Sequence, residues 1–243
     1  MPEFSMWDKR RGIFVPKEYT PVLAELFGVY AGDGCLAIYV RGTTTDYRLT
    51  ISGSVDDEPY LQYVAGLIHT QFGVCSTLKP RREPGRAWLE LICRSKAIVT
   101  YFAENGFASG RKRNIRIPEW IYAQPQFMVG FLRGLLDTDG YVGRIAKGKL
   151  GVYPVLSFQF KPKQLVIDAS TSLIALGFKP CVCLDVQTID GRTGAMSVKN
   201  HLYLNGWRNL LLWNKLIGSR NPKNLGKLAA LAKKFETSAL AQL

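Results

Sequence analysis

The stretch "RGLLDTDGYV" (residues 133–142) places two carboxylates, Asp137 and Asp139, between an apolar run and a glycine. An apolar run that leads into glycine is typical of the end of a buried helix. The C-terminal end of a helix carries partial negative charge, so carboxylates there are mildly destabilising. The pattern therefore indicates either a chance turn of turn-forming residues or a site for a positively charged partner.

The first half of the chain contains a second copy of this pattern. It reads "FGVYAGDGCL" (residues 27–36), and Asp33 corresponds to Asp139 at an offset of 106 residues. Gly28 corresponds to Gly134 at the same offset. A register shared by two halves of one chain makes chance a poor explanation of the pattern.

Both copies are preceded by a helix-start signal. Thr20 and Pro21 precede the first copy, and Gln124 and Pro125 precede the second. Proline suits the first turn of a helix, where its missing N–H is not needed. We expect each helix to end at its glycine, in the left-handed conformation that glycine adopts readily.

Small residues recur every four positions along each helix, and residues four apart share one helix face. They are Ala24 and Gly28 in the first copy, and Gly130 and Gly134 in the second. Such a stripe lets two backbones approach closely. The two helices are therefore expected to pack on each other around a pseudo-two-fold axis, with Asp33 facing Asp139.

Two carboxylates at two negative helix ends need a compensating partner. One of them could be protonated, as in an acid dyad. A hard divalent cation such as Mg²⁺, bound by carboxylate and carbonyl oxygens, is the simpler solution. The alternative is two ordinary Asp-Gly turns that follow core helices. Together with a basic surface, a cation site predicts metal-assisted phosphodiester hydrolysis.

The segments "LFGVYAGDG" (26–34) and "LRGLLDTDG" (132–140) resemble the two motifs of LAGLIDADG homing endonucleases, in the single-chain, two-motif form. The resemblance covers most of the chain. The acid at the eighth position is present in both copies, as Asp33 and Asp139, whereas the sixth position is acidic only in the second copy.

The resemblance implies a monomeric, site-specific endonuclease that depends on Mg²⁺, cuts both DNA strands and leaves short 3′ overhangs. Asp33 and Asp139, with the carbonyls of Gly32 and Thr138, would hold the metal. It also suggests basic residues around the site; Lys96 and Lys161 are the candidates. The implied origin is a mobile intron reading frame that acts in intron homing. The implied partner is double-stranded DNA with a long, partly asymmetric target site, and no protein partner is implied.

The rest of the sequence predicts an α+β fold of two pseudo-symmetric helix-hairpin-helix-hairpin-helix halves, which form a DNA-binding saddle with the motif helices packed at its centre. Alternating strands and turn residues predict two hairpins in each half, with turns at 42–45 and 80–86 in the first. Helices are expected at 58–72, 162–176 and 207–239. The expected domains are an N-terminal half (1–109), a basic linker (110–123) and a C-terminal half (124–243).

A two-stranded ribbon fits the DNA major groove, so basic and polar residues of the hairpins are candidates for contacts with nucleic acid. Exposed strands also carry charges to prevent edge pairing, which is the alternative explanation. The linker "GRKRNIRIPEW" (110–120) either follows a phosphate backbone or is simply solvated. The candidate DNA-binding residues are Tyr39, Arg41, Arg48, Lys79, Arg81, Arg82, Arg86, Arg144, Lys147, Lys149 and Arg192.

The overall composition agrees with a nucleic-acid partner. The 243 residues carry a formal net charge of +13, and a folded chain this basic usually meets a polyanion. No apolar run reaches the length of a spanning helix and no signal-peptide core is visible, so an intracellular, soluble protein of the cytoplasm or an organellar matrix is expected. The cysteines form no CxxC pair, and Cys181 and Cys183 are expected to be buried thiols.

Two other functions remain open. One is a non-catalytic nucleic-acid-binding protein of the same fold, an RNA maturase or a transcription regulator. The other is a structural RNA-binding protein in which the motif serves only in core packing. Retention of both acids favours cleavage, because a paired carboxylate site is costly to keep without a cation. No residues beside the motifs resemble protein-splicing junctions, so a complete intein is not expected.

Overall fold

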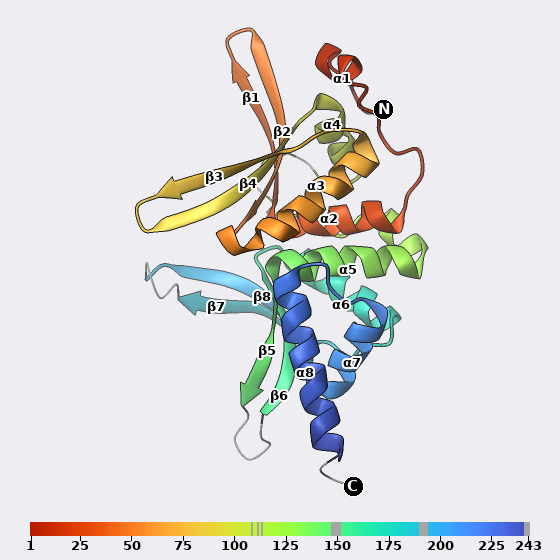
Figure 1. Cartoon of the computed structure of the whole chain (residues 1–243), viewed down its shortest axis with the longest axis vertical. Helices are drawn as coiled ribbons and strands as arrows, with labels where there is room; N and C mark the ends of the chain where they lie inside the picture. The colour runs from red at the N-terminus through yellow and green to blue at the C-terminus, as the bar shows by residue number, and fades with distance from the viewer. Residues whose placement is uncertain (108, 111, 113, 147–151, 190–193, 241–243) are drawn as a thin grey trace. The chain divides into compact units, whose positions relative to one another are not determined.

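The computed structural model describes residues 1–107, 109–110, 112, 114–146, 152–189 and 194–240 (Figure 1). The α-helices are α1 (Met6–Arg10), α2 (Pro21–Asp33), α3 (Glu58–Phe72), α4 (Lys96–Glu104), α5 (Pro125–Asp139), α6 (Lys163–Ala175), α7 (Gly206–Leu216) and α8 (Pro222–Leu240). The strands are β1 (Gly34–Arg41), β2 (Thr44–Gly53), β3 (Thr77–Glu83), β4 (Arg86–Arg94), β5 (Gly140–Ala146), β6 (Val152–Phe160), β7 (Cys181–Ile189) and β8 (Met196–Asn205). Two short 3-10 helices, η1 (Val55–Asp57) and η2 (Glu119–Ala123), precede α3 and α5.

The order of elements confirms the predicted α+β class. Helix α2 leads into the β1–β2 hairpin, α3, the β3–β4 hairpin and α4; helix α5 leads into β5–β6, α6, β7–β8 and α7. The predicted helix-hairpin-helix-hairpin-helix pattern therefore occurs twice, and α8 follows the second copy.

The contacts divide the chain into two compact units. Unit 1 comprises Met1–Lys112 and Pro118–Thr138, and unit 2 comprises Arg113–Ile117 and Asp139–Leu243. Helix α5 therefore groups with unit 1, because it packs directly on α2, although in the chain it leads into the sheet of unit 2. The division into halves at 1–109, 110–123 and 124–243 stays a prediction.

Helix α2 begins where the sequence signals it. The side chain of Thr20 accepts a hydrogen bond from the backbone N–H of Leu23 (3.1 Å), and Pro21 occupies the first helical turn. The expected left-handed glycine at its end is wrong, since Gly34 is extended, with φ −79° and ψ 152°. A glycine is needed there for space, because a Cβ on Gly34 would lie 2.4 Å from Cδ2 of Tyr30.

The glycines of α2 and α5 lie at the contact between these two helices. A Cβ on Gly28 would lie 2.0 Å from the carbonyl oxygen of Phe131, and one on Gly134 would lie 2.2 Å from that of Glu25. A Cβ on Gly130 would lie 2.3 Å from the carbonyl oxygen at the first residue of α2. The two backbones thus touch without intervening side chains, so no larger residue fits at these positions.

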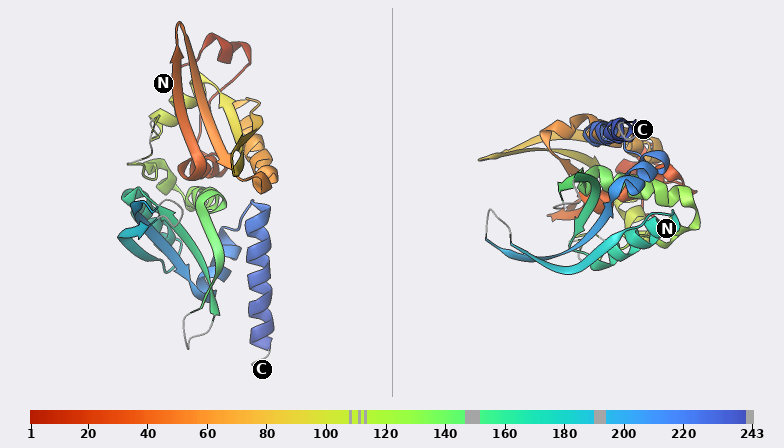
Figure 2. Two further views of the ribbon diagram at one scale, coloured as in Figure 1. Left: turned by 90° about the vertical axis from the view of Figure 1, so that its left-hand side faces the viewer. Right: turned by 90° about the horizontal axis from the view of Figure 1, so that it is seen from below.

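In unit 1, the antiparallel sheet has the order β1-β2-β4-β3. Helices α2, α3 and α4 all pack against β2, on the side where Leu49 and Ile51 are buried (Figure 2). Side chains alternate between the two faces of a strand. The opposite face therefore carries the remaining strand residues without a helical cover from these three helices.

In unit 2, the antiparallel sheet has the order β5-β6-β8-β7. Helices α6 and α7 pack against β6 and β8, and the core includes the fully buried Leu156, Leu204 and Trp213. Helix α8 runs beside the edge strand β5 (Figures 1 and 2). Strand β7 forms the other edge and has an irregular register between Cys183 and Val186.

Three expectations about element boundaries and burial are wrong. The second hairpin turns at 84–85, because the expected turn residues 80–83 belong to β3. The expected helix over 207–239 is two helices, and Trp213 Nε1 donates to the carbonyl of Gly218 in the break between them (2.8 Å). Cys181 and Cys183 are exposed, because they lie on an edge strand and alternate with Val182, which pairs with the core residue Leu202.

Candidate active site and nucleic-acid interface

The C-terminal end of α2 joins a carboxylate to a set of backbone carbonyls. Asp33 is the last residue of the helix and is half-buried, whereas Gly32 before it is buried. The last carbonyls of a helix have no partner within the helix and carry its partial negative charge. This end of α2 is therefore a place where a cation is stabilised.

A cationic group of the chain does lie there. Lys112 Nζ donates to the carbonyl oxygens of Tyr30 and Ala31, at 3.1 Å each, and to that of Gly32. The same Nζ is 5.6 Å from the centre of the Tyr30 ring, in cation–π geometry. The ammonium group shows that these oxygens accept a positive charge.

The donor set also fits a hard metal ion. Mg²⁺ prefers carboxylate and carbonyl oxygens and is usually held by one or two carboxylates. Within the described residues, no group of three or more His, Cys, Asp or Glu side chains is arranged to hold a metal. A cation at the end of α2 would therefore depend on Asp33 together with backbone oxygens such as that of Gly32.

At the end of α5, the residues of the second motif have different environments. Asp139 is the last helical residue and is exposed, whereas Asp137 is buried, with 3% of its surface exposed. The Thr138 hydroxyl donates back to the carbonyl oxygens of Gly134 (2.9 Å) and Leu135 (3.2 Å). Thr138 could therefore offer a metal its carbonyl oxygen rather than its hydroxyl. The facing of Asp33 and Asp139 stays a prediction.

A buried polar network lies between α2, α3 and α5. Glu25 is almost fully buried, accepts from Tyr63 Oη at 2.7 Å and forms an ion pair with Arg133 Nη1 at 2.8 Å. Burial, with the charges of Asp137 and Glu25, raises the pKa of Tyr60 well above its usual value. The Tyr60 phenol therefore stays protonated beside these carboxylates. The sequence signalled this network only through Glu25, the one charge in an apolar run.

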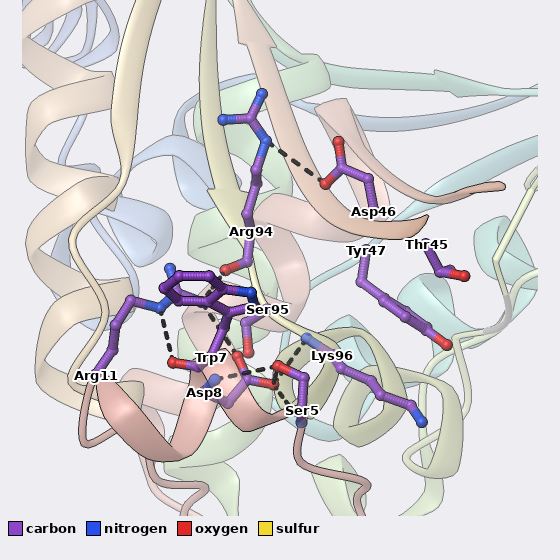
Figure 3. A pocket seen from close by; sticks show the side chains of 10 residues that line it. All are labelled: Ser5, Trp7, Asp8, Arg11, Thr45, Asp46, Tyr47, Arg94, Ser95 and Lys96. Carbon is purple, nitrogen blue, oxygen red and sulfur yellow. Dashed lines mark hydrogen bonds and ion pairs between the residues drawn. The ribbon is translucent and has the colours of Figure 1, made fainter. Parts of the chain in front are cut away.

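Lys96 is placed away from the end of α2. It opens α4, and its Nζ pairs with Glu3 at 2.5 Å. The same Nζ lies 5.6 Å from the ring centre of Tyr47; Figure 3 shows both of these side chains. Glu3 raises the pKa of Lys96. Tyr47 pairs with Ile38, four residues along β1 from Gly34, which is about 13 Å at strand spacing. The structure therefore does not bring Lys96 to Asp33.

Lys161 occupies a different position in its sheet. It is exposed, follows the last residue of β6, and its carbonyl accepts from Asn200 Nδ2 at 2.9 Å. Phe158 pairs with Gly140, the first residue of β5. Lys161 therefore lies about 10 Å along the strand from the residue that follows Asp139, at the same end of the sheet.

The face of the unit 1 sheet opposite its helices carries most of the predicted DNA-binding residues of that unit. Strand pairing places Tyr39 opposite Asp46, Lys79 opposite Glu90 and Arg81 opposite Trp88, all on this face. We call it the open face of unit 1. The candidates on it are Tyr39, Arg41, Arg48, Lys79, Arg81 and Arg86.

Several of these cations already have protein partners. Arg48 forms an ion pair with Asp46 and stacks over Tyr39 at 4.9 Å, and Arg81 pairs with Glu90 at 2.8 Å. The Arg48 guanidinium lowers the pKa of Asp46. A phosphate that binds there would exchange with a carboxylate.

The other candidates are distributed differently. Arg82 alternates with Arg81 and so points to the opposite face of β3. Arg144 shares the face of Val142, which is buried, and lines a hollow with Lys227 of α8. Lys147, Lys149 and Arg192 lie outside the described residues.

The corresponding face in unit 2 carries a histidine that the sequence did not single out. His201 pairs with Cys183 across β7 and β8, and its Nδ1 lies 2.8 Å from the Tyr203 hydroxyl. Its Nε2 is buried with no hydrogen-bond partner within the described residues. Gln159 pairs with His201 from the other side and adds a further polar group to this face.

The fold is similar to that of several solved structures. I-DmoI in complex with DNA and Mn is 22% identical, with a TM-score of 0.53 over 81% of this chain and 96% of that chain. The meganuclease I-SmaMI bound to uncleavable DNA is 13% identical, with a TM-score of 0.52 over 88% and 89%. The LAGLIDADG homing endonuclease I-GzeII in complex with its DNA target is 11% identical, with a TM-score of 0.51 over 91% and 92%.

The chain has the LAGLIDADG homing endonuclease fold. In this fold, α2 and α5 are the two motif helices, each ending in an acid. No protein-family model matches the chain.

A curated relative, the iron–sulfur cluster assembly SufBD family protein ML0593 of Mycobacterium leprae (strain TN), is 26% identical over 221 residues. This alignment covers 90% of the chain but 23% of that relative, so the chain spans about a quarter of the relative's length. Among the residues that the structure describes, no helix is both long enough and apolar enough to cross a membrane.

Proposed function

We propose that the chain is a site-specific DNA endonuclease that hydrolyses phosphodiester bonds in both strands with the help of a divalent cation, preferably Mg²⁺. The observation that carries this proposal is the end of α2, where three carbonyls already accept an ammonium group beside Asp33. The repeat of the acid in α5, as Asp139, supports it. The LAGLIDADG fold and the charge of +13 agree with a nucleic-acid substrate.

We further propose roles for the two acids, the helix-end carbonyls and Lys161. Asp33 and Asp139, with the carbonyls of Gly32 and Thr138, hold the cation or cations. The chemistry that a bound Mg²⁺ supplies is Lewis-acid stabilisation of charge on the scissile phosphate. Lys161, at the sheet end that follows Asp139, orients water and balances charge near the α5 end.

The open face of unit 1 is proposed to lie along the DNA. Its arginines and Lys79 would contact mostly phosphates, which fix register, while Tyr39 and the strand polar groups reach base edges. Exchange of Asp46 or Glu90 for a phosphate frees Arg48 or Arg81 for this contact. The proposed partner is double-stranded DNA with a long, partly asymmetric site, bound by a single chain. Short 3′ overhangs and an intron-encoded origin belong to the same proposal.

The acids give the decisive experiment. Asp33→Asn and Asp139→Asn keep the side-chain size and remove the charge that holds the cation. We expect each variant to lose at least about a hundredfold in cleavage rate, because the stabilisation supplied by a metal is several kcal/mol. DNA affinity and melting temperature should remain near wild type, since relief of negative charge at a helix end is not destabilising.

The measurement starts with selection of cleaved sites from a DNA library, with and without Mg²⁺. Gel-shift affinity, melting temperature and cleavage are then compared on the selected site. Asp56→Asn, an exposed carboxylate in η1, is the matched control and should cut at the wild-type rate. Specific DNA or RNA binding without cleavage would instead support the non-catalytic regulator or maturase. Near-normal cutting by both acid variants would remove these carboxylates from the mechanism.

A further inference from the structure

The contact of Lys112 with the end of α2 is not explained by the proposed function. Lys112 is separated from Gly32 by 80 residues, yet its Nζ donates to the carbonyls of the last turn of α2. The contacts are partly buried. A lysine in a solvated linker would not be expected to direct all three donors of its ammonium group at one helix end.

The chain positions this lysine beside the motif. Two residues earlier, the backbone N–H of Gly110 donates to the carbonyl of Leu36 in β1 at 3.0 Å. Leu36 lies two residues after Gly34, where the chain leaves α2. Gly110 is thus held next to the helix end that Lys112 contacts.

The ammonium group and a divalent cation need the same oxygen. A carbonyl that accepts a hydrogen bond from Nζ at close range presents its lone pairs to that group, and two positive charges a few ångströms apart repel each other. A lysine is also a compact point charge with three donors, which suits a cluster of carbonyls. Occupation of the Gly32 carbonyl by Lys112 and coordination of that carbonyl to a metal therefore oppose each other.

We propose that Lys112 is a positioning residue that competes with the divalent cation for the carbonyl end of α2. In the DNA-free protein, its ammonium group neutralises the helix end and keeps the Gly32 carbonyl covered. Entry of the metal requires Lys112 to leave that oxygen. This inference rests on the proposed function, because it takes Gly32 and Asp33 as metal ligands.

The test measures metal binding without DNA. Lys112→Met keeps a long side chain and removes the charge and the donors. We expect the variant to bind Mn²⁺ about tenfold more tightly than wild type, since one charged hydrogen bond of typical strength no longer has to be broken. Binding is followed by the electron paramagnetic resonance signal of free Mn²⁺ at fixed protein concentration.

Two controls assign the effect to this site. Lys17→Met removes an exposed lysine elsewhere in unit 1 and should bind Mn²⁺ as wild type does. Asp33→Asn combined with Lys112→Met should lose the added affinity. Without divalent cation, Lys112→Met should melt at a lower temperature than wild type, and Mn²⁺ should raise its melting temperature more than it raises that of wild type.

The outcomes separate the two proposals. Equal or weaker Mn²⁺ binding by Lys112→Met, with Asp33-dependent DNA cleavage by wild type, overturns the competition and leaves the endonuclease standing. Absence of Mn²⁺ binding in both proteins, with no cleavage, overturns both. If Lys112→Met does not fold, Lys112→Gln removes the charge but keeps a neutral donor for the carbonyls, so it should bind Mn²⁺ more tightly than wild type but by less than about tenfold; no tightening at all overturns the competition.

Discussion

The two motif helices share their small residues and their final acid, and they differ at most of the other positions. Gly28 in α2 and Gly134 in α5 occupy equivalent positions, and a Cβ on them would lie 2.0 Å and 2.2 Å, respectively, from a carbonyl oxygen of the other helix. One turn before Gly28, α2 carries Glu25, where α5 has Phe131. The shared positions therefore provide the close approach of the helices, and the differing positions provide the polar contacts.

The Glu25–Arg133 ion pair illustrates what the difference permits. Arg133 corresponds to Phe27 of α2, which is fully buried and stacks on Phe102 at 4.4 Å. Two identical α2 helices would place a phenylalanine where this pair needs an arginine. A single chain with two different motif helices can bury an ion pair that two identical helices could not form. The pair therefore favours packing of α2 on α5 over packing of either helix on a second copy of itself.

The largest expected effect comes from a substitution at the glycine contact that both helices share. Gly134→Leu would drive a side chain into the backbone of α2, since even a Cβ would lie 2.2 Å from the Glu25 carbonyl oxygen. We expect a loss of about 3 kcal/mol in the free energy of unfolding, at the upper end for overpacked sites. Cleavage should fall with it, because α5 carries the second acid. Urea unfolding and melting temperature give the measurement.

Gly66→Leu is the matched control for this substitution. Gly66 lies within α3 and is exposed, and a Cβ at this position would meet no atom of a neighbouring element within 4 Å. Replacement of a helical glycine by leucine there should raise stability by a few tenths of a kcal/mol to about 1 kcal/mol. Equal stability of the two leucine variants would contradict the backbone contact.

A smaller effect is expected from breaking the Glu25–Arg133 ion pair, whose residues the two helices do not share. Arg133→Met leaves Glu25 buried and, within the part of the chain that the structure describes, hydrogen-bonded by Tyr63 alone. Removal of one partner of a buried pair costs about 3–5 kcal/mol, and we expect about 2 kcal/mol because 20% of the Arg133 side chain is exposed. The double variant Glu25→Met/Arg133→Met should recover part of this loss in urea unfolding. No recovery would mean that the two side chains are not energetically coupled.

Local signals predicted the helices and the α2–α5 contact, and they predicted the other tertiary contacts poorly. The range 58–72 was predicted for α3 and is confirmed, because proline near its start and an αL glycine after its end mark both termini in the sequence. The break at Gly218 was missed, since the bond from Trp213 that stabilises it depends on packing in unit 2. The stripe of glycines was visible as a period of four residues.

The site was predictable only in its repeated part. Asp33 and Asp139 follow from the shared register, whereas Lys112 has no sequence signal that separates it from the other cations of the linker. Its role depends on a contact across 80 residues. Lys96 stood at a strand-to-helix junction as expected, but its side chain pairs with Glu3.

A last comparison concerns α4 and α7, the helices that follow the second hairpin of each copy. The Ser95 hydroxyl caps α4 by accepting from the N–H of Ile98 at 3.2 Å, and Asp8 of α1 accepts from the first two N–H groups of the helix, at 3.1 and 3.2 Å. Asn205, the N-cap of α7, makes no side-chain capping bond. Helix α4 therefore has a buried carboxylate at its positive end (Figure 3), whereas α7 has no acidic residue in its first turn.

The smallest expected effect comes from removal of the Asp8 carboxylate at the start of α4. Burial opposes ionisation of Asp8, but hydrogen bonds from Ser5 and Ala97 outweigh it and lower the pKa of Asp8. Asp8→Asn should cost about 1 kcal/mol at pH 7, the usual value of a cap. Folding lowers the pKa of this carboxyl, so its charge stabilises the protein fully when the pH is above the unfolded-state pKa of an aspartate, about 3.9. This stabilisation is lost as the pH falls through the pKa of the folded state. The stability gap between wild type and Asp8→Asn in urea unfolding should therefore narrow from pH 7 to pH 3, whereas Asp56→Asn, at an exposed site, should show little gap at either pH. A gap that stays constant with pH would mean that the charge of Asp8 does not stabilise α4.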